Sequence, residues 1–293
     1  IAEDGIECRS GDLRDILAAD RFDLVVFGPE EPLVRGVADD LRAAGHLVYG
    51  PGRDGARLEA SKAFSKEVMT AAGVPTAAFG AFTDPAAATA FARERFARGK
   101  GVAVKASGNA LGKGVVVCGE PEEAEEAIRR MMTEREFGDA GATVVVEDRL
   151  TGFEFSLLTI VGDENVVSLP VAQDHKRVGE GDTGPNTGGM GTFAPVDRVP
   201  ASLVERTERE IVLPLLAELK RRGIAYRGTL FSGLMMDGDD PLCLEYNVRF
   251  GDPETQSVMR LVEGGFAEAL RAAAAGERIS APSIADGHAL TVV

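Results

Sequence analysis

Residues 244–254 read Leu-Glu-Tyr-Asn-Val-Arg-Phe-Gly-Asp-Pro-Glu, and the other motifs of the chain are organised around them. Side chains of a β-strand alternate between two faces, so a strand here places Glu245, Asn247 and Arg249 on one face and apolar side chains on the other. Carboxylate and amide oxygens are ligands for Mg²⁺, and a guanidinium beside them suits a phosphate or a carboxylate. The turn that follows adds two more carboxylates, Asp252 and Glu254. An edge strand with its polar side chains in solvent has the same pattern, so the functional interpretation depends on motifs elsewhere.

The composition is that of a globular protein. A chain of 293 residues is long enough for two domains and a sizeable core. The formal net charge of −15 argues against nucleic acid or an anionic membrane surface as a partner, because both require a basic surface. An anionic small substrate remains compatible with this net charge, because its binding depends on a local cluster of Arg and Lys. No apolar run approaches the roughly 18 residues of a membrane span.

The cysteines and histidines give no sign of a metal site. Cys8, Cys118 and Cys243 lie far apart and form no CxxC pair. They are expected to be free thiols, which indicates a reducing, cytoplasmic compartment. The histidines show no metal-ligand spacing, and no Ser/His/Asp or Cys/His arrangement indicates a covalent nucleophile.

The N-terminal part predicts a βαβ unit. An apolar run at residues 22–27 predicts a strand that ends at the turn carrying Glu30. A helix is expected next, with Pro32 in its first turn, and residues 47–49 form the following strand. This pattern predicts an open parallel α/β sheet. Ligands bind such sheets at the carboxyl ends of the strands, which is where Glu30 falls.

A helix is predicted over residues 58–72, ended by Gly73. Lys62 and Lys66 are four residues apart and share one face of it. Two interpretations of these cations remain open: a solvated helix face, or a site for an anion such as a triphosphate.

A glycine-rich turn at residues 107–114 joins two apolar runs, 102–106 and 115–118, which predicts a β-hairpin. The turn is not a P-loop, because its glycine spacing is one residue short and no Ser or Thr follows Lys113. Such a hairpin can close over phosphates with its N–H groups and Lys113, while Lys105 reaches them from below. An ordinary hairpin is the alternative.

A helix that begins at Pro121 and a strand at residues 144–147 complete a small α+β lobe around this hairpin. The stretch just past Val146 is expected to be the hinge that returns the chain to the main body. Adenine is commonly held at such a hinge by backbone groups and apolar walls, which makes Glu147 and Leu150 candidates for the nucleotide site.

Paired strands are predicted at residues 153–158 and 166–169, followed by a cationic segment at 173–177. Residues 179–191 contain six glycines, which are expected to exclude any regular element. A loop of this length in a compact domain is usually functional, and a disordered linker is the alternative.

The C-terminal part predicts further helices and strands. A capping box at Ser202 is expected to open a helix that ends at Gly223 and is kinked or split at Pro214. The last elements expected are two antiparallel strands, a helix and a further strand, at residues 229–236, 242–250, 263–275 and 288–293.

Five motifs resemble one enzyme family. They read GPEEPL at residues 28–33, SKAF at 61–64, QDHKR at 173–177, DTGPNTGGMG at 182–191 and RFGDPETQ at 249–256. With the order of the elements, they make the chain similar to the ATP-grasp ligases and, among these, to the phosphoribosylamine–glycine ligase family, also called glycinamide ribonucleotide synthetase. The resemblance covers nearly the whole chain, and the loop motif at 182–191 is its most specific part.

The resemblance implies a mixed α/β and α+β architecture, in which an ATP-grasp fold is preceded by part of an open parallel α/β (pre-ATP-grasp) domain. Residues 1–57 would be the partial N-terminal α/β substrate domain. Residues 58–283 would be the ATP-grasp domain, with a mobile lid at about 77–148. Residues 284–293 would begin a truncated C-terminal domain.

The chain departs from the family at its ends and in the lid. The family opens with a strand and a Gly-Gly-Arg-Glu-His-type loop and ends with a C-terminal domain, whereas this chain begins after the first and stops before the second. We therefore expect a fragment of a longer gene, which need not be active alone. In the lid, Ser107 stands where the family usually has Asp, and Asn109 where a small apolar residue is usual.

The family's reaction is the ATP-dependent ligation of glycine to 5-phosphoribosylamine through glycyl phosphate, in de novo purine biosynthesis. It gives glycinamide ribonucleotide, ADP and phosphate, and the cofactors implied are ATP and Mg²⁺ or Mn²⁺. The partners implied are these small molecules, without nucleic acid or membrane, for a monomer or a chain fused to other purine-pathway domains. Another ATP-grasp carboxylate–amine ligase and a non-catalytic nucleotide-binding module are the alternatives.

The resemblance also assigns site residues. The catalytic candidates are Arg249, Lys105 and Asp174. The ATP-binding candidates are Lys62, Lys105, Lys113, Glu147, Leu150 and, for the ribose hydroxyls, Glu154. The expected metal ligands are Glu245 and Asn247. The substrate candidates are Glu30, Lys176, Arg177, Asp182, Asn186, Thr187, Gly188, Arg249 and Asp252.

Charge suggests individual contacts within this set. Asp174 or Asp182 would pair with the ammonium group of glycine, and Arg249 with its carboxylate. Lys176 and Arg177 would neutralise the phosphate of the acceptor.

Overall fold

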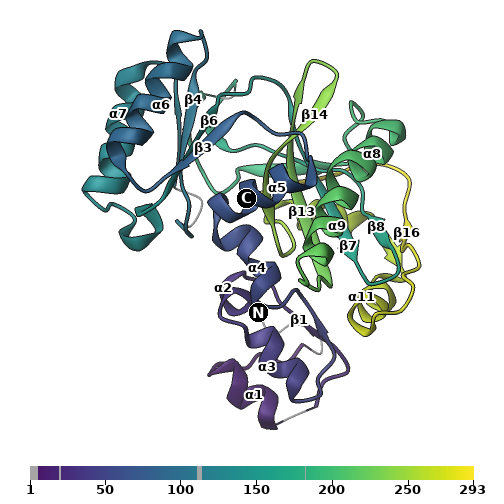
Figure 1. Ribbon diagram of the computed structural model, residues 1–293. Coiled ribbons are helices and arrows are strands. Elements are labelled where there is room, and N and C mark those ends of the chain that lie inside the picture. The colour runs from purple at the N-terminus through teal and green to yellow at the C-terminus, as the bar shows by residue number, and fades with distance from the viewer. Residues whose placement is uncertain (1–5, 20, 111–113, 182) are drawn as a thin grey trace.

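The computed structural model describes residues 6–19, 21–110, 114–181 and 183–293. Figure 1 shows three regions: a small N-terminal region at the bottom, a lobe of sheet and helices at the upper left, and a larger body on the right. None of the helices that these residues form is long and apolar enough to cross a membrane.

The N-terminal region contains the predicted βαβ unit. Its elements are α1 (Leu13–Ala19), β1 (Val25–Val26), α2 (Glu31–Val34), α3 (Val37–Ala43) and β2 (Val48–Tyr49). β1 pairs with β2 in parallel, with Val25 opposite Val48, which confirms the predicted pairing. The single helix expected after Glu30 is wrong, because Gly36 adopts a left-handed conformation with φ of 82° and separates α2 from α3.

The helix predicted over residues 58–72 is also two helices, α4 (Arg53–Ala60) and α5 (Lys62–Ala72). Ser61 separates them, because its backbone is extended and its hydroxyl caps α5 by accepting a hydrogen bond from the Phe64 N–H at 3.2 Å. α5 ends at Gly73 in the left-handed conformation, as predicted.

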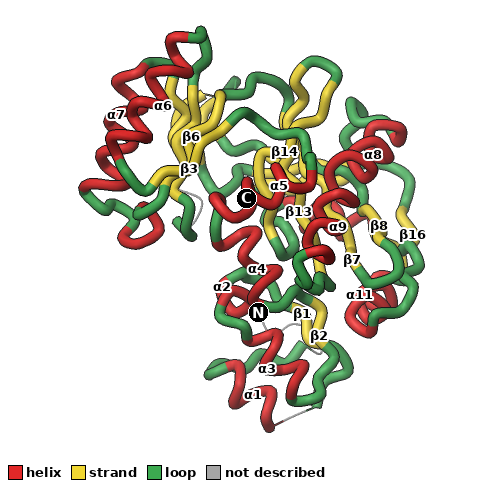
Figure 2. The backbone as a smooth tube through the Cα atoms, in the orientation of Figure 1, coloured by secondary structure: helices red, strands yellow, loops and turns green. Residues whose placement is uncertain are grey.

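The lobe at the upper left is an antiparallel sheet of order β3-β6-β4-β5. Its strands are β3 (Phe79–Phe82), β4 (Val102–Ala106), β5 (Val115–Cys118) and β6 (Val144–Asp148). Two helices, α6 (Pro85–Ala97) and α7 (Pro121–Ile128), cover the outer face of the sheet (Figure 2). A π-helical turn (Arg129–Thr133) and a 3-10 turn (Gly138–Gly141) follow α7. The predicted hairpin of β4 and β5 is confirmed, with Lys105 opposite Val115.

The body is built on a second antiparallel sheet, of order β14-β13-β7-β8. Its strands are β7 (Glu154–Val161), β8 (Val166–Ser168), β13 (Gly228–Asp237) and β14 (Asp240–Asn247). Side chains from α5 and from α9 (Leu213–Arg221) pack on one face, and those from α11 (Phe266–Ala275) pack on the other. Tyr246 and Val248 lie in the core against α5 and α9, so the polar side chains of β14 face the opposite side.

Two details of the predicted helix over residues 202–223 differ. The capping box at Ser202 is wrong, because α8 (Ala201–Thr207) begins one residue earlier, with Pro200 at its N-cap and no side-chain cap. The split at Pro214 is confirmed: a π-helical turn (Glu208–Val212) joins α8 to α9, whose second residue is this proline. Proline has no N–H to donate, which favours a break in the helical hydrogen bonding at this point.

The glycine-rich segment contains regular structure, so the expectation that its glycines exclude it is wrong. β10 (Arg177–Gly179) and β11 (Thr183–Asn186) form an antiparallel ribbon. Glycine makes this ribbon possible, because a Cβ on Gly179 would lie 2.6 Å from the hydroxyl oxygen of Thr183. β12 (Gly191–Ala194) then pairs with β9 (Gln173–Asp174) and with β17 (Ala289–Val292), the predicted last strand.

The segment after β14 also differs from the prediction. α10 (Glu254–Leu261) begins directly after the turn, and β15 (Val262–Gly264) pairs with β16 (Ser283–Ile284). The helix expected from residue 263 therefore begins only at Phe266, because Gly265 has φ of 77° and separates it from β15. The domain boundaries at residues 57 and 283 stay predictions.

Candidate active site

Four cations from different segments surround the carboxylate of Glu245. Burial works to raise its pKa, but nearby Lys105, Lys62, Lys176 and Arg249 outweigh burial and lower it. Lys105 comes from β4 in the upper lobe, Lys62 from the N-terminus of α5, and the other two from the body. The fold thus gathers side chains that are up to 187 residues apart in sequence, since Lys62 and Arg249 act on one carboxylate. Side chains from the separate motifs therefore lie close to one carboxylate, as the sequence led us to expect.

Glu147 holds two of the predicted lysines. Its Oε2 lies 2.6 Å from the Nζ of Lys66, and its Oε1 pairs with the Nζ of Lys105. The carboxylate is 3% exposed; burial would raise its pKa, but the two lysines lower it. Thr76 also accepts a hydrogen bond from Lys66, at 2.6 Å. Lys66 is therefore a buried side chain, and the solvated-face interpretation is wrong for it.

The pairing of Glu147 limits how it can take part in a site. Its carboxylate is occupied by the two lysines, so its evident effect is to hold in place the Lys105 side chain that lowers the pKa of Glu245. Burial would lower the pKa of Lys105, but Glu147 and Glu245 raise it, so this side chain carries a firm positive charge. Leu150 lies between β6 and β7, at the predicted hinge.

Lys176 is placed among carboxylates. Its Nζ lies 3.4 Å from Glu154 Oε2 and 3.8 Å from Asp174 Oδ2. Burial would lower its pKa, but Asp174, Glu154 and Glu245 raise it. Three residues predicted for different ligands, Lys176, Glu154 and Asp174, therefore form one polar cluster beside Glu245.

A turn carboxylate that was not among the candidate site residues lies next to Asp174. Glu254, the first residue of α10, is 3% exposed and accepts a hydrogen bond from Ser156 at 3.1 Å. Burial raises its pKa, and nearby Asp174 raises it further, whereas Lys176 and Ser156 lower it. The expectation of a loop carboxylate is wrong at this position, because Glu254 starts a helix and points into the protein.

A second missed residue, Glu59, contacts Arg249. Glu59 Oε1 lies 3.0 Å from the Nη2 of Arg249, and its Oε2 accepts a hydrogen bond from the Val248 N–H at 2.7 Å. Glu30 Oε2 lies farther from Arg249, at 3.7 Å from its Nε, and Glu30 also accepts a hydrogen bond from Asn109 at 2.8 Å. Glu30 therefore lies at the site, as predicted, and so does the unusual lid residue Asn109.

The remaining substrate candidates are less closely gathered. Thr187 is tied to Lys176, because its N–H and its hydroxyl both donate to the Lys176 carbonyl, at 2.6 and 2.8 Å. Arg177 donates instead to the Gly184 carbonyl of its own ribbon, at 2.9 Å. Asp252 is exposed and accepts a hydrogen bond from Gln256, and Gly188 is exposed.

Three predicted residues have no described side-chain geometry. Lys113 and Asp182 lie outside the described residues. Asn186 is described only by its backbone, which belongs to β11.

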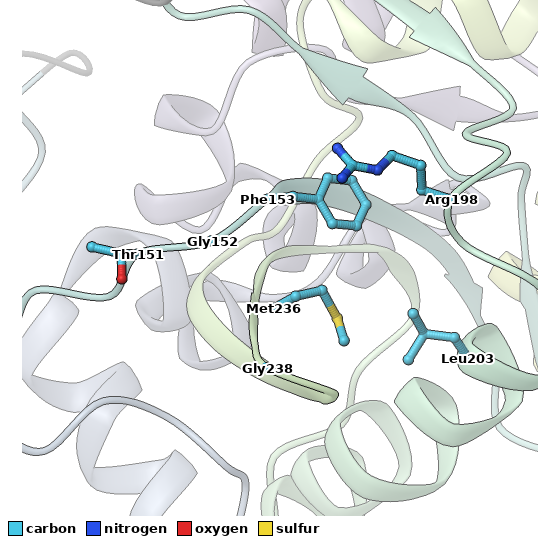
Figure 3. Close-up of a pocket in the computed structure, with 7 residues that line it drawn as sticks. All are labelled: Thr151, Gly152, Phe153, Arg198, Leu203, Met236 and Gly238. Atoms are coloured by element: carbon cyan, nitrogen blue, oxygen red, sulfur yellow. The ribbon is translucent and has the colours of Figure 1, made fainter.

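The pocket in Figure 3 is separate from this cluster. It has a volume of about 380 Å³ and is lined by Thr151, Gly152, Phe153, Arg198, Leu203, Met236 and Gly238. Phe153 stacks on Phe155, which belongs to the core against α5 and α9, whereas Glu154 between them points to the other face of the sheet. The Arg198 guanidinium lies 5.0 Å from the Phe153 ring. The pocket is therefore behind the sheet, away from Glu245.

The polar face of β14 suits a divalent cation that arrives with a nucleotide. Within the described ranges, no group of three or more His, Cys, Asp and Glu side chains forms a metal cage. Mg²⁺ usually takes one or two carboxylates together with the phosphates of its substrate, so a complete protein cage is not required. Glu245 and Asn247 supply a carboxylate and an amide oxygen on one face of one strand, and the lowered pKa keeps Glu245 anionic. The donor set fits the ion.

Two facing sheets, a lysine on the lobe and a carboxylate–amide strand on the body define the ATP-grasp class. The fold is shared with solved structures of other proteins. The biotin carboxylase of Campylobacter jejuni superimposes with a TM-score of 0.73 at 18% sequence identity, over 92% of this chain and 58% of that one. At this identity the likeness concerns the fold alone.

The particular family follows from closer matches. The family model described as "Phosphoribosylglycinamide synthetase, ATP-grasp (A) domain" matches residues 60–255, and the one for the N domain of the same synthetase matches residues 2–59. The chain belongs to the phosphoribosylglycinamide synthetase family.

Relatives within the family are similar over most of this chain. A phosphoribosylamine–glycine ligase of Vibrio cholerae is 45% identical over 257 residues, which are 87% of this chain and 59% of the relative. The solved phosphoribosylamine–glycine ligase of Thermotoga maritima has a TM-score of 0.85 and 32% identity, over 97% of this chain and 69% of that one. The chain spans about three fifths of the length of the curated relatives that it matches.

Proposed function

We propose that this chain, as part of its full-length protein, ligates glycine to 5-phosphoribosylamine at the expense of ATP. The products are glycinamide ribonucleotide, ADP and phosphate, and the reaction belongs to de novo purine biosynthesis. The observation that carries the proposal is the convergence of Lys62, Lys105, Lys176 and Arg249 on Glu245 in a member of this family. The likeness to named phosphoribosylamine–glycine ligases supports the choice of substrates.

The chemistry requires charge neutralisation rather than a covalent nucleophile. A carboxylate is a poor acylating agent, so ATP first converts glycine to glycyl phosphate, and the amine of phosphoribosylamine then displaces the phosphate. Phosphoryl transfer depends chiefly on positioning and on electrostatic stabilisation of the charged oxygens. Cations held in fixed positions around the reacting phosphate meet this requirement.

Lys105 and Lys62 are the residues that would contact the phosphates of ATP. Lys105 is held by Glu147, and Glu147 and Glu245 raise its pKa, which keeps its charge at the site before ATP arrives. Glu245 and Asn247 would hold Mg²⁺ or Mn²⁺. When bound, the ion neutralises charge on the phosphate oxygens. A solved biotin carboxylase domain of the same fold contains MgADP, which supports ATP and Mg²⁺ as ligands here. Glu154 would accept hydrogen bonds from the ribose hydroxyls.

The substrates would occupy the cluster next to these phosphates. Arg249 would take the carboxylate of glycine, and Asp174 its ammonium group. Lys176 would neutralise the phosphate of the acceptor, helped by the loop that Thr187 ties to it. Arg177 is a weaker candidate for binding this phosphate, because its guanidinium donates a hydrogen bond to the Gly184 carbonyl of its own ribbon.

Glycyl phosphate must be shielded from water. The lobe built on β3 to β6 and the ribbon of β10 and β11 would close over the cluster. Other properties follow from composition: the charge of −15 supports small molecules rather than nucleic acid as partners, and the three cysteines, which lie far apart in sequence and form no CxxC pair, support a cytoplasmic setting. A monomer, or a chain fused to other purine-pathway domains, is proposed.

The test is a turnover assay on the full-length protein. ADP release is measured with glycine, ATP and Mg²⁺ while phosphoribosylamine is generated in place, and the product is identified by mass. We expect ADP release only when glycine and phosphoribosylamine are both present. Turnover with another amino acid but not with glycine would indicate a different carboxylate–amine ligase. ATP binding without turnover in any combination would indicate a nucleotide-binding module.

A further inference from the structure

Glu59 is placed where a carboxylate is unfavourable. It lies in the last turn of α4, and the C-terminal end of a helix carries partial negative charge. Its carboxylate is also 11% exposed, so it has little water to stabilise its charge. A carboxylate in this position needs strong partners.

Both partners of Glu59 belong to the segment that leaves β14. One carboxylate oxygen accepts the Val248 N–H at 2.7 Å, and the other lies 3.0 Å from Arg249 Nη2. Burial raises the pKa of Glu59, while Arg249 and the Val248 N–H oppose that change. The carboxylate thus contacts the backbone and the side chain of two consecutive residues.

The other contacts of Arg249 hold it less tightly. Glu30 Oε2 is 3.7 Å from its Nε, which is longer than a hydrogen bond, and the Phe250 carbonyl accepts from Nη1 at 3.2 Å. A guanidinium has five N–H donors in one plane. Among the described residues, Glu59 is the carboxylate within hydrogen-bond distance of this plane, and it leaves other N–H groups for a ligand.

We propose that Glu59 is a positioning residue, which holds one edge of the Arg249 guanidinium so that the other edge receives the carboxylate of a small amino acid. An Arg side chain that is not held must lose its rotamer freedom when the ligand binds, which weakens binding. The inference rests on the proposed function, because it deepens the role of Arg249 in that site.

A purely structural role is the alternative, in which Glu59 only attaches α4 to the end of β14. Glu59→Gln separates the two roles. The Gln side chain has the same size and keeps a carbonyl oxygen for the Val248 N–H, but it has no charge to pair with Arg249. The variant therefore preserves the structural contact and removes the positioning contact.

The experiment measures ADP release by the full-length protein against glycine concentration, at saturating ATP and with phosphoribosylamine generated in place. We expect Glu59→Gln to raise the KM for glycine about tenfold or more, since hydrogen bonds to charged groups are among the stronger ones. The affinity for ATP, measured by calorimetry, should stay within about twofold of wild type. Glu218→Gln is the matched control, because Glu218 is a buried glutamate paired with Arg221 and Arg222 on α9, and its glycine KM should not change.

A double-mutant cycle tests whether Glu59 acts through Arg249. In an Arg249→Met background, Glu59→Gln should change the glycine KM by less than about twofold, because the group that it positions is gone. An equal increase in both backgrounds would overturn the proposal, as would an unchanged glycine KM in the single variant. If Glu59→Gln is recovered poorly, Glu59→Asp withdraws the carboxylate and should shift the KM in the same direction.

The same assay separates this inference from the proposed function. A wild-type protein without glycine-dependent turnover would overturn both. A glycine-dependent wild type with an unaffected Glu59→Gln variant would overturn only the role of Glu59.

Discussion

Glu245 and Glu254 belong to one short segment, yet their surroundings shift their pKa values in opposite directions. Glu245 is buried among cations, which outweigh burial and lower its pKa. Glu254 is buried beside Asp174, and both burial and that carboxylate raise its pKa. The lowered pKa favours the anionic form of Glu245, which suits a metal ligand, whereas the surroundings of Glu254 make its charge less favourable. The difference comes from residues distant in sequence, so the motif alone does not reveal which glutamate does what.

The largest effect is expected from removing the anionic member of this pair. Glu245→Gln replaces the proposed carboxylate ligand by a neutral amide, so Mg²⁺-dependent ATP cleavage in the full-length protein should fall about 100-fold or more. Glycine-dependent ADP release at saturating Mg²⁺ measures it. Glu277→Gln is the control, because this glutamate is exposed and pairs with Arg271 far from the site. Turnover near the wild-type rate would show that Glu245 is not a metal ligand.

The next effect concerns the cation that contributes most to lowering the pKa of Glu245. Lys105→Ala should weaken ATP binding about tenfold or more, because a buried positive charge at the proposed phosphate site is lost. Calorimetric titration with ATP gives the affinity, and Lys100→Ala, at an exposed position just before β4, is the control. Equal affinities for Lys105→Ala and wild type would remove Lys105 from the nucleotide site.

The pH dependence of stability should differ in sign between the two glutamates. The raised pKa of Glu254 means that its stabilising contribution is present below the ordinary Glu pKa of about 4.3 and is lost as the pH rises through the raised value. The lowered pKa of Glu245 gives a contribution that is present above the ordinary value and is lost as the pH falls through the lowered one.

Urea denaturation of both Gln variants over a range of pH tests this contrast. As the pH rises from about 4, the unfolding free energy of Glu254→Gln should increase relative to wild type. As the pH falls below about 4, the deficit of Glu245→Gln relative to wild type should shrink. The same sign for both variants would contradict the opposite directions of the two pKa shifts.

The smallest effect is expected at the hydrogen bond that satisfies Glu254. Ser156→Ala should lower the free energy of unfolding by about 1 kcal/mol, because the Glu254 oxygen loses its donor. Ser232→Ala is the matched control, since Ser232 is buried on the adjacent strand β13 and its hydroxyl has no hydrogen-bond partner among the described residues. Equal losses for both variants would show that the bond to Glu254 contributes nothing specific.

The local pattern predicted the features that depend on neighbours in sequence. The alternation along residues 244–250 predicted the polar face of β14, although the strand ends at Asn247 and Arg249 lies beyond it. The glycines around residue 110 predicted the hairpin that carries Lys105. The resemblance to the family gathered the separate motifs into one site, and the cluster around Glu245 has the expected members.

The sequence did not reveal what depends on distant partners. In the sequence, Glu59 is an ordinary helical glutamate, and only the folded structure shows its contact with Arg249. Glu254 likewise reads as a turn residue, and only the structure shows that it begins α10 and accepts a hydrogen bond from Ser156. An unfavourable carboxylate in the last turn of α4 was the one local signal that could have found Glu59. The ribbon at residues 177–186 was missed because glycine permits a turn and a close strand pair as readily as an irregular loop.

The shared carboxylate of Glu147 has a mechanical consequence. Glu147 and Lys105 belong to the sheet of the upper lobe, whereas Lys66 belongs to α5 of the body. A rotation of the lobe relative to the body must therefore either part the buried pair of Lys66 and Glu147 or carry α5 along. Ser107 adds a second attachment, because its carbonyl and its hydroxyl accept the N–H groups of the first two residues of α5, at 2.8 and 3.0 Å. These contacts attach the lobe to α5 at two points, so we expect any rotation of the lobe to be resisted at that helix.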